Sequence, residues 1–318
     1  MSHVLEVTGP IYLLMALGYL ALRAQWLAPA DLRVLGRFVV LFCLPALLFR
    51  SLAKQPLMQI LQADYLMIYA TGSLMTLGTV LLVARVVLGR PWSLAAMQAM
   101  GATGSNSAFV GYPIVLQVLG PVASLGLALG ALVENLLVIP LSLMLAEASG
   151  SEHGRRQAFV QAFKGLGRNP LILSMLAGLA VSATGWGLPS VLDRGLGLVA
   201  AAAPPTALFV IGGSLVGMKL DGIRSDLALV AGGKLLLHPL CMWALVHCFP
   251  LAQAPLNASA VLFAAMPMMS IYGVLSQRFG HEKFCSAALL AATLGSFFTI
   301  NALLAFLPAA WLVAAPAH

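Results

Sequence analysis

The sequence predicts an all-helical, polytopic membrane protein with ten transmembrane helices in two inverted repeats of five. The chain of 318 residues is 61% hydrophobic and only 8% charged, whereas charged residues make up about 25% of an ordinary soluble domain. Ten apolar segments are long enough to cross a bilayer, and basic residues concentrate in alternate connections between them. These three observations exclude an ordinary soluble domain. The net charge of +7 has a topological explanation and does not predict nucleic-acid binding.

Each predicted span can cross a hydrocarbon core of about 30 Å at roughly 1.5 Å per helical residue. The spans are residues 4–22, 34–53, 65–84, 94–118, 121–146, 170–189, 195–218, 226–249, 256–277 and 284–307. The first apolar run is preceded by Glu6 and by no Lys or Arg. We therefore expect it to be a retained helix and not a cleaved signal peptide.

The longest polar connection divides the chain into a first repeat (1–147), a linker (148–169) and a second repeat (170–318). The loops after spans 1, 3, 5, 7 and 9 carry 13 of the 17 Lys and Arg residues, and the opposite side carries Arg50, Lys54 and Arg194. By the positive-inside rule the linker is expected in the cytoplasm and both termini in the periplasm, in a bacterial inner membrane. An odd number of spans per repeat then makes the repeats inverted.

An internal repeat supports the inversion independently. Residues 10–18 match residues 170–178, and residues 45–49 match residues 205–209, both with a shift of 160. The shared Pro, Met and Gly positions carry more weight than the shared leucines, because apolar matches arise easily by chance in membrane proteins.

Two spans contain helix breakers around small polar residues. Span 4 holds Gly101-Ala-Thr-Gly-Ser-Asn-Ser-Ala-Phe-Val-Gly-Tyr-Pro113, and span 9 holds Ala264-Ala-Met-Pro-Met-Met-Ser-Ile-Tyr-Gly273. Unwound backbone is tolerated at mid-membrane only where protein buries it or where it lines a wet cavity, and paired broken helices indicate a transporter binding site. Aligning residues 91–94 with 255–258 places Asn106 against Ser270. The alternative is a pair of Pro-kinked packing helices. The predicted substrate-binding residues are Asn106, Ser107, Gly111, Pro113, Pro267, Ser270 and Gly273, together with Lys234.

The element Asn106-x-x-Phe-x-Gly-x-Pro113, the element Ala265-Met-Pro267 and the five-plus-five layout resemble the auxin efflux carrier family over essentially the whole chain. Bacterial members of that family include proteins named as malonate transporters, and its fold is related to that of bile-acid sodium symporters. The resemblance implies that spans 4 and 9 cross at mid-membrane beside a panel of spans 1, 2, 6 and 7, and that substrates are small organic anions. Plant auxin exporters have an acidic residue in span 3. Here residues 65–84 offer the polar residues Thr71, Ser73, Thr76 and Thr79 instead, so proton chemistry does not carry over from them.

Two charges lie inside predicted spans, Glu134 in span 5 and Lys234 in span 8. An unpaired ion at mid-membrane costs at least about 2.5–3.5 kcal/mol, so each needs a partner or a role. Lys234 is expected to face the cavity as a substrate cation, the alternative being a side chain that snorkels to an interface. Glu134, followed by Asn135, is assigned to ion pairing or coupling: it pairs with Lys234, binds a coupling cation or carries a proton. The sequence does not rank these roles.

The sequence offers no catalytic constellation, so the protein is expected not to be an enzyme. Gly195-x-Gly opens a membrane span without a preceding strand, and Cys43, Cys241, Cys248 and Cys285 lack metal-ligand spacing. We expect no metal and no cofactor. The predicted function is a secondary carrier of a mono- or dicarboxylate that works by alternating access. A channel or passive pore and a sodium-coupled symporter are the alternatives. The coupling ion (H⁺, Na⁺ or none) and a homodimeric state stay open.

Overall fold

A computed structural model describes residues 2–54, 62–147, 167, 169–217, 224–269, 272–277 and 279–312. These residues are helical or form connections, with one isolated antiparallel bridge between two connections. The predicted all-helical class is therefore confirmed. The predicted linker 148–169 lies outside the described residues except for Gly167 and Asn169, and Ser270 also lies outside them.

The chain divides into two compact units, each with segments from both predicted repeats. Unit 1 comprises Met1–Ala63, Ala108–Leu129 and Gly167–Gly217, and unit 2 comprises Asp64–Ser107, Gly130–Leu166 and Met218–His318. The helices of predicted spans 1, 2, 6 and 7 all lie in unit 1, which is the set that the family resemblance implies for a panel. Unit 1 holds α1 (Ser2–Arg23), α2 (Pro29–Phe38), η1 (Val39–Cys43), α3 (Leu44–Ala53), α7 (Tyr112–Leu119), α11 (Pro170–Thr184), α12 (Ser190–Ala201) and α13 (Ala203–Ser214).

Unit 2 holds the first half of predicted span 4 and the whole described part of span 9. Its helices are α5 (Ala63–Leu82), η2 (Val83–Val87), α6 (Trp92–Thr103), η4 (Glu134–Val138), α9 (Ile139–Ala146), α14 (Arg224–Gly232), η6 (Gly233–Leu237), α15 (His238–Cys248), α16 (Ala254–Ala265), α17 (Tyr272–Gln277), α18 (Glu282–Phe306) and α19 (Ala309–Leu312). The helices η3 (Ser107–Gly111) and α8 (Val122–Val133) have residues in both units, as does α5 through its first residue, Ala63.

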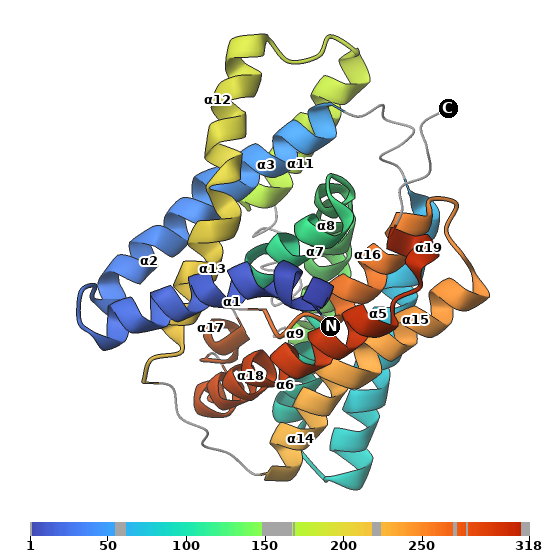
Figure 1. The fold of residues 1–318 in the computed structure, drawn as a ribbon. Helices are drawn as coiled ribbons and strands as arrows, with labels where there is room; N and C mark the ends of the chain where they lie inside the picture. The colour runs from blue at the N-terminus through green and yellow to red at the C-terminus, as the bar shows by residue number, and fades with distance from the viewer. Residues whose placement is uncertain are drawn as a thin grey trace. The chain divides into compact units, whose positions relative to one another are not determined.

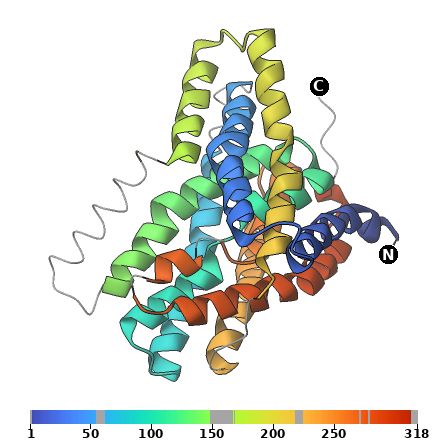
Figure 2. The same cartoon turned by 90° about the vertical axis from the view of Figure 1, so that its left-hand side faces the viewer.

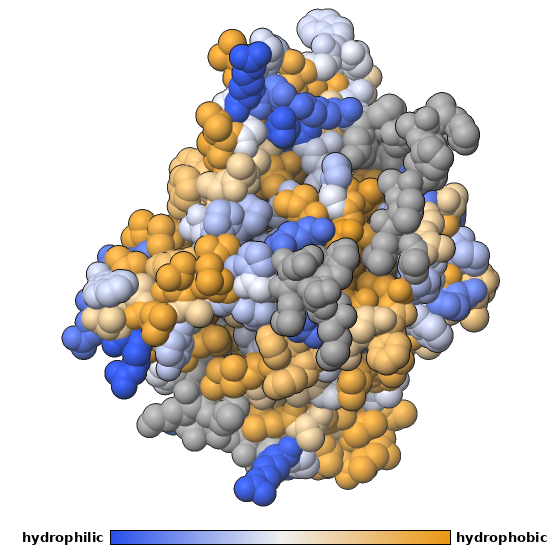
Figure 3. All heavy atoms as spheres, viewed as in Figure 1, coloured by the Kyte–Doolittle hydropathy of each residue, from blue (hydrophilic) through white to orange (hydrophobic). Residues whose placement is uncertain are grey.

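Six helical stretches are long and apolar enough to span a bilayer: Pro29–Ala53, Ala63–Val87, Val122–Ala146, Ser190–Ser214, Arg224–Cys248 and Lys283–Phe306. Four shorter apolar helices, Tyr12–Arg23, Ser107–Leu119, Pro170–Thr184 and Ala254–Ala265, overlap the other four predicted spans. Hydrophobic side chains make up much of the visible surface (Figure 3). Among the exposed large apolar side chains of the protein are Phe298 and Phe306. A water-soluble protein rarely exposes such large apolar patches, so the chain is a multi-pass membrane protein.

Four of the helices are widened by a π-helical turn just before a proline. The turns η1, η3, η4 and η6 end two residues before Pro45, Pro113, Pro140 and Pro239, respectively. Proline lacks a backbone N–H and clashes with the carbonyl one turn earlier, and a wider turn relieves that conflict while the helix continues. These prolines therefore bend helices without ending them.

In unit 1, two helix pairs make reciprocal contacts. Helix α1 packs along α13, and α11 packs along α3 (Figure 1), while α3 lies between α11 and α12 (Figure 2). Gly18 approaches the Phe209 carbonyl oxygen so closely that no Cβ fits, and a Cβ on Gly178 would lie 2.8 Å from the Phe49 carbonyl oxygen. A shift of 160 residues converts Gly18 into Gly178 and Phe49 into Phe209. The two contacts are therefore equivalent under the shift that the sequence repeat predicts.

In unit 2, the two predicted helix breaks meet. Helix α6 ends at Thr103 and α16 at Ala265, and the chain beyond each end forms an antiparallel bridge between Ser105 and Met268. The Asn106 N–H donates to the Pro267 carbonyl at 2.7 Å, and the Met269 N–H donates to the Gly104 carbonyl at 3.2 Å. The breaks thus satisfy each other's backbone groups.

The register of this pairing differs by one residue from the sequence alignment. If the two repeats are aligned so that Gly104 corresponds to Pro267 and Asn106 to Met269, each of these hydrogen bonds maps onto the other. This alignment is a shift of 163 residues, whereas the sequence alignment is a shift of 164. The sequence alignment matches the starts of the two helices. At the crossing, backbone hydrogen bonds set the register instead.

Substitution of the reciprocal glycines tests the packing of unit 1. Gly18→Ala and Gly178→Ala should each lower the melting temperature of the detergent-purified protein, since overpacking costs about 1–3 kcal/mol. Gly195→Ala is the matched control, because a Cβ there meets nothing within 4 Å and alanine favours helix by about 1 kcal/mol. Equal melting temperatures for all three variants would contradict the reciprocal packing.

A disulfide tests the crossing in unit 2. Ser105 and Met268 form a non-hydrogen-bonded antiparallel pair, for which a Cα–Cα distance of about 4.5 Å suits a disulfide. In a variant without the native cysteines, Ser105→Cys with Met268→Cys should crosslink under mild oxidation. A protease site inserted within residues 148–166 would separate the halves, and the crosslink should hold them together on a non-reducing gel. Each single cysteine variant is the control, and two free halves from the double variant would rule out the crossing.

Candidate functional site

The ammonium of Lys234 lies at the crossing of the two broken helices. Its side chain is 0% exposed, and its Nζ donates to Ser105 Oγ at 2.6 Å and to the Ala264 carbonyl at 2.8 Å. Two longer contacts join Nζ to His238 Nδ1 at 2.9 Å and to the Thr103 carbonyl at 3.3 Å. An ammonium has three donors, so these four acceptors occupy all of its directions.

The two carbonyls bound by Lys234 belong to helix ends. Thr103 is the last residue of α6, and Ala264 is the second-last residue of α16. The last four carbonyls of a helix have no partner within it, and the C-terminus carries roughly half a negative charge from the helix dipole. A single cation therefore stabilises the C-terminal ends of both half-helices where they meet.

Glu134 lies on the opposite side of Ser105. Its side chain is 6% exposed, and its Oε1 accepts from the Ser105 N–H at 3.0 Å, from Ser107 Oγ at 3.3 Å and from the Tyr69 hydroxyl at 3.5 Å. Ser107 is the first residue of η3, which continues into α7. The carboxylate thus meets the positive N-terminal end of the second half of broken helix 4.

Glu134 and Lys234 are connected through Ser105. The described ion pairs are those of Arg50 and Lys54 with Asp193 and of Arg90 with Asp226, so the two buried charges form no direct pair within the described part of the chain. Instead, the Ser105 N–H donates to Glu134 and the Ser105 hydroxyl accepts from Lys234. The backbone of the helix break therefore lies between one anion and one cation.

Both charges project from π-helical turns. Glu134 is the first residue of η4, and Lys234 is the second residue of η6. Each turn precedes a proline, Pro140 or Pro239, which lacks the N–H that a regular helix would need there. Such π-helical turns are frequent at functional sites. Local sequence thus widens the helix at the position where each charged side chain enters the site.

His238 extends the network to α5. Because an ammonium only donates, His238 Nδ1 accepts from Lys234, and this assignment places the imidazole proton on Nε2. Nε2 lies 3.3 Å from Ser73 Oγ. This fully buried side chain therefore has a polar partner on each ring nitrogen.

Two tyrosines of α5 continue the network, since the Tyr69 hydroxyl donates to Glu134. The rings of Tyr65 and Tyr69 stack at 5.8 Å with planes 8° apart, and the Tyr69 ring meets the His238 ring edge-on at 6.1 Å. Tyr65 and Ser259 are 0% exposed, and within the described residues neither hydroxyl has a hydrogen-bond partner that satisfies both distance and angle.

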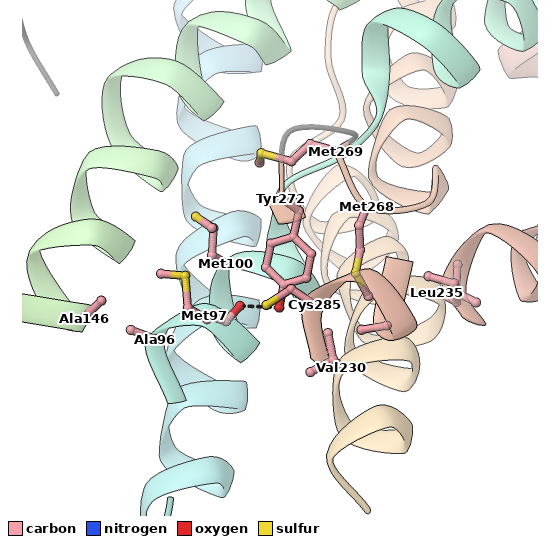
Figure 4. Packing of buried hydrophobic residues seen from close by; sticks show 12 residues of the cluster. Ala96, Met97, Met100, Ala146, Val230, Leu235, Met268, Met269, Tyr272 and Cys285 are labelled. Atoms are coloured by element: carbon pink, nitrogen blue, oxygen red, sulfur yellow. Dashed lines mark hydrogen bonds between the residues drawn. The ribbon is translucent and has the colours of Figure 1, made fainter. Parts of the chain in front are cut away.

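A methionine-rich cluster packs next to the crossing and includes Met268 and Met269. Figure 4 shows the ring of Tyr272 among Met97, Met100, Met269 and Cys285. The Tyr272 hydroxyl donates to the Met97 carbonyl at 2.8 Å. A Cβ on Gly101 would lie 2.6 Å from that hydroxyl oxygen, so the first glycine of the span 4 motif makes room for the Tyr272 ring.

The structure places most of the predicted site residues in or near the helix breaks. Asn106, Ser107 and Pro267 are buried at the crossing, and Lys234 contacts it directly. Gly273 is half-buried in α17, and Asn135 is half-buried with its Nδ2 donating to the Ala131 carbonyl at 2.8 Å. Gly111 and Pro113 are buried at the η3–α7 junction, in unit 1. Ser270 lies outside the described residues.

Sequence reasoning missed the uncharged partners of the two charges. Ser105, Thr103, Tyr69 and Tyr65 were not singled out, and Ser73 was noted only as a polar residue of span 3. The four-residue spacing of Tyr65, Tyr69 and Ser73 on one helix face is the signal that was available. Among the described residues, no group of three or more His, Cys, Asp or Glu could hold a metal ion.

Known proteins of similar sequence show to which family the chain belongs. The sequence matches the family described as "Membrane transport protein" over residues 3–304. It is 27% identical over 304 residues to the "Putative malonate transporter" of Rhizobium meliloti, which covers 94% of this chain and 95% of that protein. It is 30% identical over 282 residues to an "Uncharacterized transporter" of Methanothermobacter thermautotrophicus, with 85% and 87% covered.

A more distant relative is the mouse "Lysosomal cholesterol signaling protein", which is 25% identical over 288 residues that cover 83% of this chain and 33% of that protein. The family match confirms the resemblance that the broken-helix motifs indicated. The chain belongs to the membrane transport protein family, which is auxin efflux carrier-like, and it is a transporter and not an enzyme.

Proposed function

We propose that the protein is a secondary carrier that moves a small mono- or dicarboxylate across the membrane by alternating access, with the substrate bound at the crossing of broken helices 4 and 9. The antiparallel pairing of Ser105 with Met268 between a buried cation and a buried anion carries this proposal. A plain membrane span needs no such break. The name of the Rhizobium relative supports a dicarboxylate such as malonate as the first substrate to test.

The electrostatics of the crossing favour an anionic substrate. A carboxylate that enters the membrane loses its water, and a nearby full cation lowers that cost. Lys234 supplies this cation, and the Ser105 hydroxyl is its neutral side-chain partner. A substrate carboxylate would replace this hydroxyl more readily than the two helix-end carbonyls. Asn106 and Ser107, buried beside the bridge, would add neutral hydrogen bonds.

The architecture proposed for this carrier is the ten-helix inverted repeat. Reciprocal packing of Gly18 on Phe209 and of Gly178 on Phe49 supports it, because the repeat shift of 160 exchanges these contacts. The basic residues of alternate loops support a cytoplasmic linker and periplasmic termini in an inner membrane. Reporters that are active only in the periplasm should respond when fused after His318 and stay silent when inserted at Arg156. The opposite pattern would reverse the topology.

Counterflow in proteoliposomes tests the carrier function. Vesicles loaded with unlabelled malonate should accumulate labelled malonate, or another mono- or dicarboxylate of the test panel, faster than empty vesicles do. A channel or passive pore gives no such acceleration by internal substrate. Absence of counterflow for every acid in the panel would contradict the proposed carrier.

Substitutions at the crossing should have effects of different size. Lys234→Ala should weaken carboxylate binding at least tenfold. Lys234→Arg should restore binding only in part, because a planar guanidinium group does not fit the four acceptors around a compact ammonium. Asn106→Ala should weaken binding roughly 2- to 12-fold, the equivalent of one neutral hydrogen bond of about 0.5–1.5 kcal/mol. Melting temperatures control for folding. Wild-type binding by a folded Lys234→Ala protein would exclude Lys234 from the substrate site.

A further inference from the structure

We propose that His238 is a positioning residue for the substrate-binding cation: its imidazole holds the ammonium of Lys234 so that the bond to Ser105 is the one that a substrate carboxylate replaces. This role rests on the proposed function, because it concerns Lys234 as the cation that binds the carboxylate. His238 contacts the cation and not the substrate, and Ser73 of α5 supports its ring.

The four acceptors around the Lys234 ammonium differ in how easily they move. The Thr103 and Ala264 carbonyls belong to the backbone of two helix ends, at 3.3 and 2.8 Å from Nζ. The Ser105 hydroxyl, at 2.6 Å, belongs to a short side chain that turns about one bond. Because an ammonium donates three hydrogen bonds, a carboxylate can replace Ser105 while two bonds to the protein remain.

His238 is the acceptor whose direction is fixed by other side chains. It is fully buried, its Nδ1 lies 2.9 Å from Lys234 Nζ, and its Nε2 lies 3.3 Å from Ser73 Oγ. The Tyr69 ring meets the imidazole edge-on, with ring centroids 6.1 Å apart. Contacts at both nitrogens and with an aromatic ring therefore fix the direction of the Nδ1 lone pair.

Lys234 needs a fixed acceptor because its ammonium lies at the end of a flexible four-carbon stem. The two carbonyl acceptors lie on other elements, α6 and α16, whereas His238 follows Lys234 by one turn at the junction of η6 and α15. The bond to Nδ1 thus holds the ammonium relative to its own helix. Without the imidazole, the helix-end carbonyls alone would hold it when Ser105 is replaced, and its direction toward a carboxylate would be less well defined.

The chemistry of a neutral imidazole suits this role. An ammonium only donates, so Nδ1 accepts from Lys234, and Nε2 carries the proton and donates it to Ser73. An imidazolium has a proton on both nitrogens and could not accept the bond from Lys234. His238 is therefore neutral while it holds the ammonium, and the full positive charge at the crossing stays on Lys234.

Two amide variants separate positioning from packing. The Asn oxygen is bonded to Cγ, as Nδ1 is in histidine, whereas Gln carries its amide one atom further out, near the place of Nε2. Purified full-length His238→Asn should bind labelled malonate, or another panel acid that shows counterflow, within about twofold of wild type. His238→Gln and His238→Leu should weaken this binding roughly 2- to 12-fold, the equivalent of one hydrogen bond. Equal affinities for the three variants would overturn the positioning role.

Ser73→Ala keeps the imidazole and removes the support of its ring. It should weaken malonate binding by a smaller factor than His238→Leu does. Thr79→Ala is the matched control, because this exposed hydroxyl of α5 donates to the Met75 carbonyl of its own helix. Melting temperatures show which variants fold, and Ser73→Ala decides if the His238 variants do not. Wild-type affinity in Ser73→Ala would then overturn the proposal.

A double-mutant cycle tests whether His238 acts through Lys234. In the Lys234→Ala protein, a further His238→Leu change should leave malonate affinity unchanged, because no ammonium remains to be positioned. The same fold loss with and without Lys234 would show that His238 acts through packing and would reject the positioning role.

The carrier function and the role of His238 are tested separately by these measurements. Absence of binding and of counterflow for every acid in the panel would reject the carrier, and the role of His238 with it. Binding that depends on Lys234 but is equally strong in a folded His238→Leu protein would retain the carrier and reject His238 as its positioning residue.

Discussion

The arrangement of unit 2 depends on one buried ammonium that binds the C-terminal ends of two half-helices. Without Lys234, the Thr103 and Ala264 carbonyls would face each other as two partial negative charges in a region of low dielectric. With it, the two helix ends can meet, and the chain beyond them pairs as a short antiparallel bridge. The cation is thus a structural requirement of the crossing before it is a ligand for any substrate.

Glu134 adds a negative charge to this arrangement but forms no direct ion pair with Lys234 among the described residues. Glu134 accepts from the Ser105 N–H and from Ser107, where the next helical segment starts with its positive end. Each charge therefore matches the helix ends of opposite sign. Because Ser105 lies between them, the two buried charges keep separate sets of hydrogen-bond partners.

Much of the fold could be predicted from sequence because the bilayer imposes simple rules. Apolar length predicts the spans, and Gly104 and Pro267 lie where two of them break, whereas Pro113 lies inside α7, beyond the break. The buried charges also stood out, since Glu134 and Lys234 interrupt apolar runs. Their partners did not, because Ser105, Tyr69 and His238 are ordinary residues in a membrane helix until tertiary contacts bring them together. The one-residue difference in register has the same origin, since backbone hydrogen bonds between distant segments leave no local signal.

The reciprocal packing of unit 1 also bears on how the protein is made. Gly18 finds its partner at Phe209, about 190 residues later in the chain. At a synthesis rate of roughly 5–20 residues per second, α1 spends about 10–40 s in the membrane before α13 has been made. During that interval its glycine-bearing face has only lipid or other early helices to contact. Helix α3 likewise has no partner until α11 has been synthesised, although this interval is shorter. Assembly of unit 1 is therefore a late event in biosynthesis, and the early helices need a membrane environment that tolerates them unpaired.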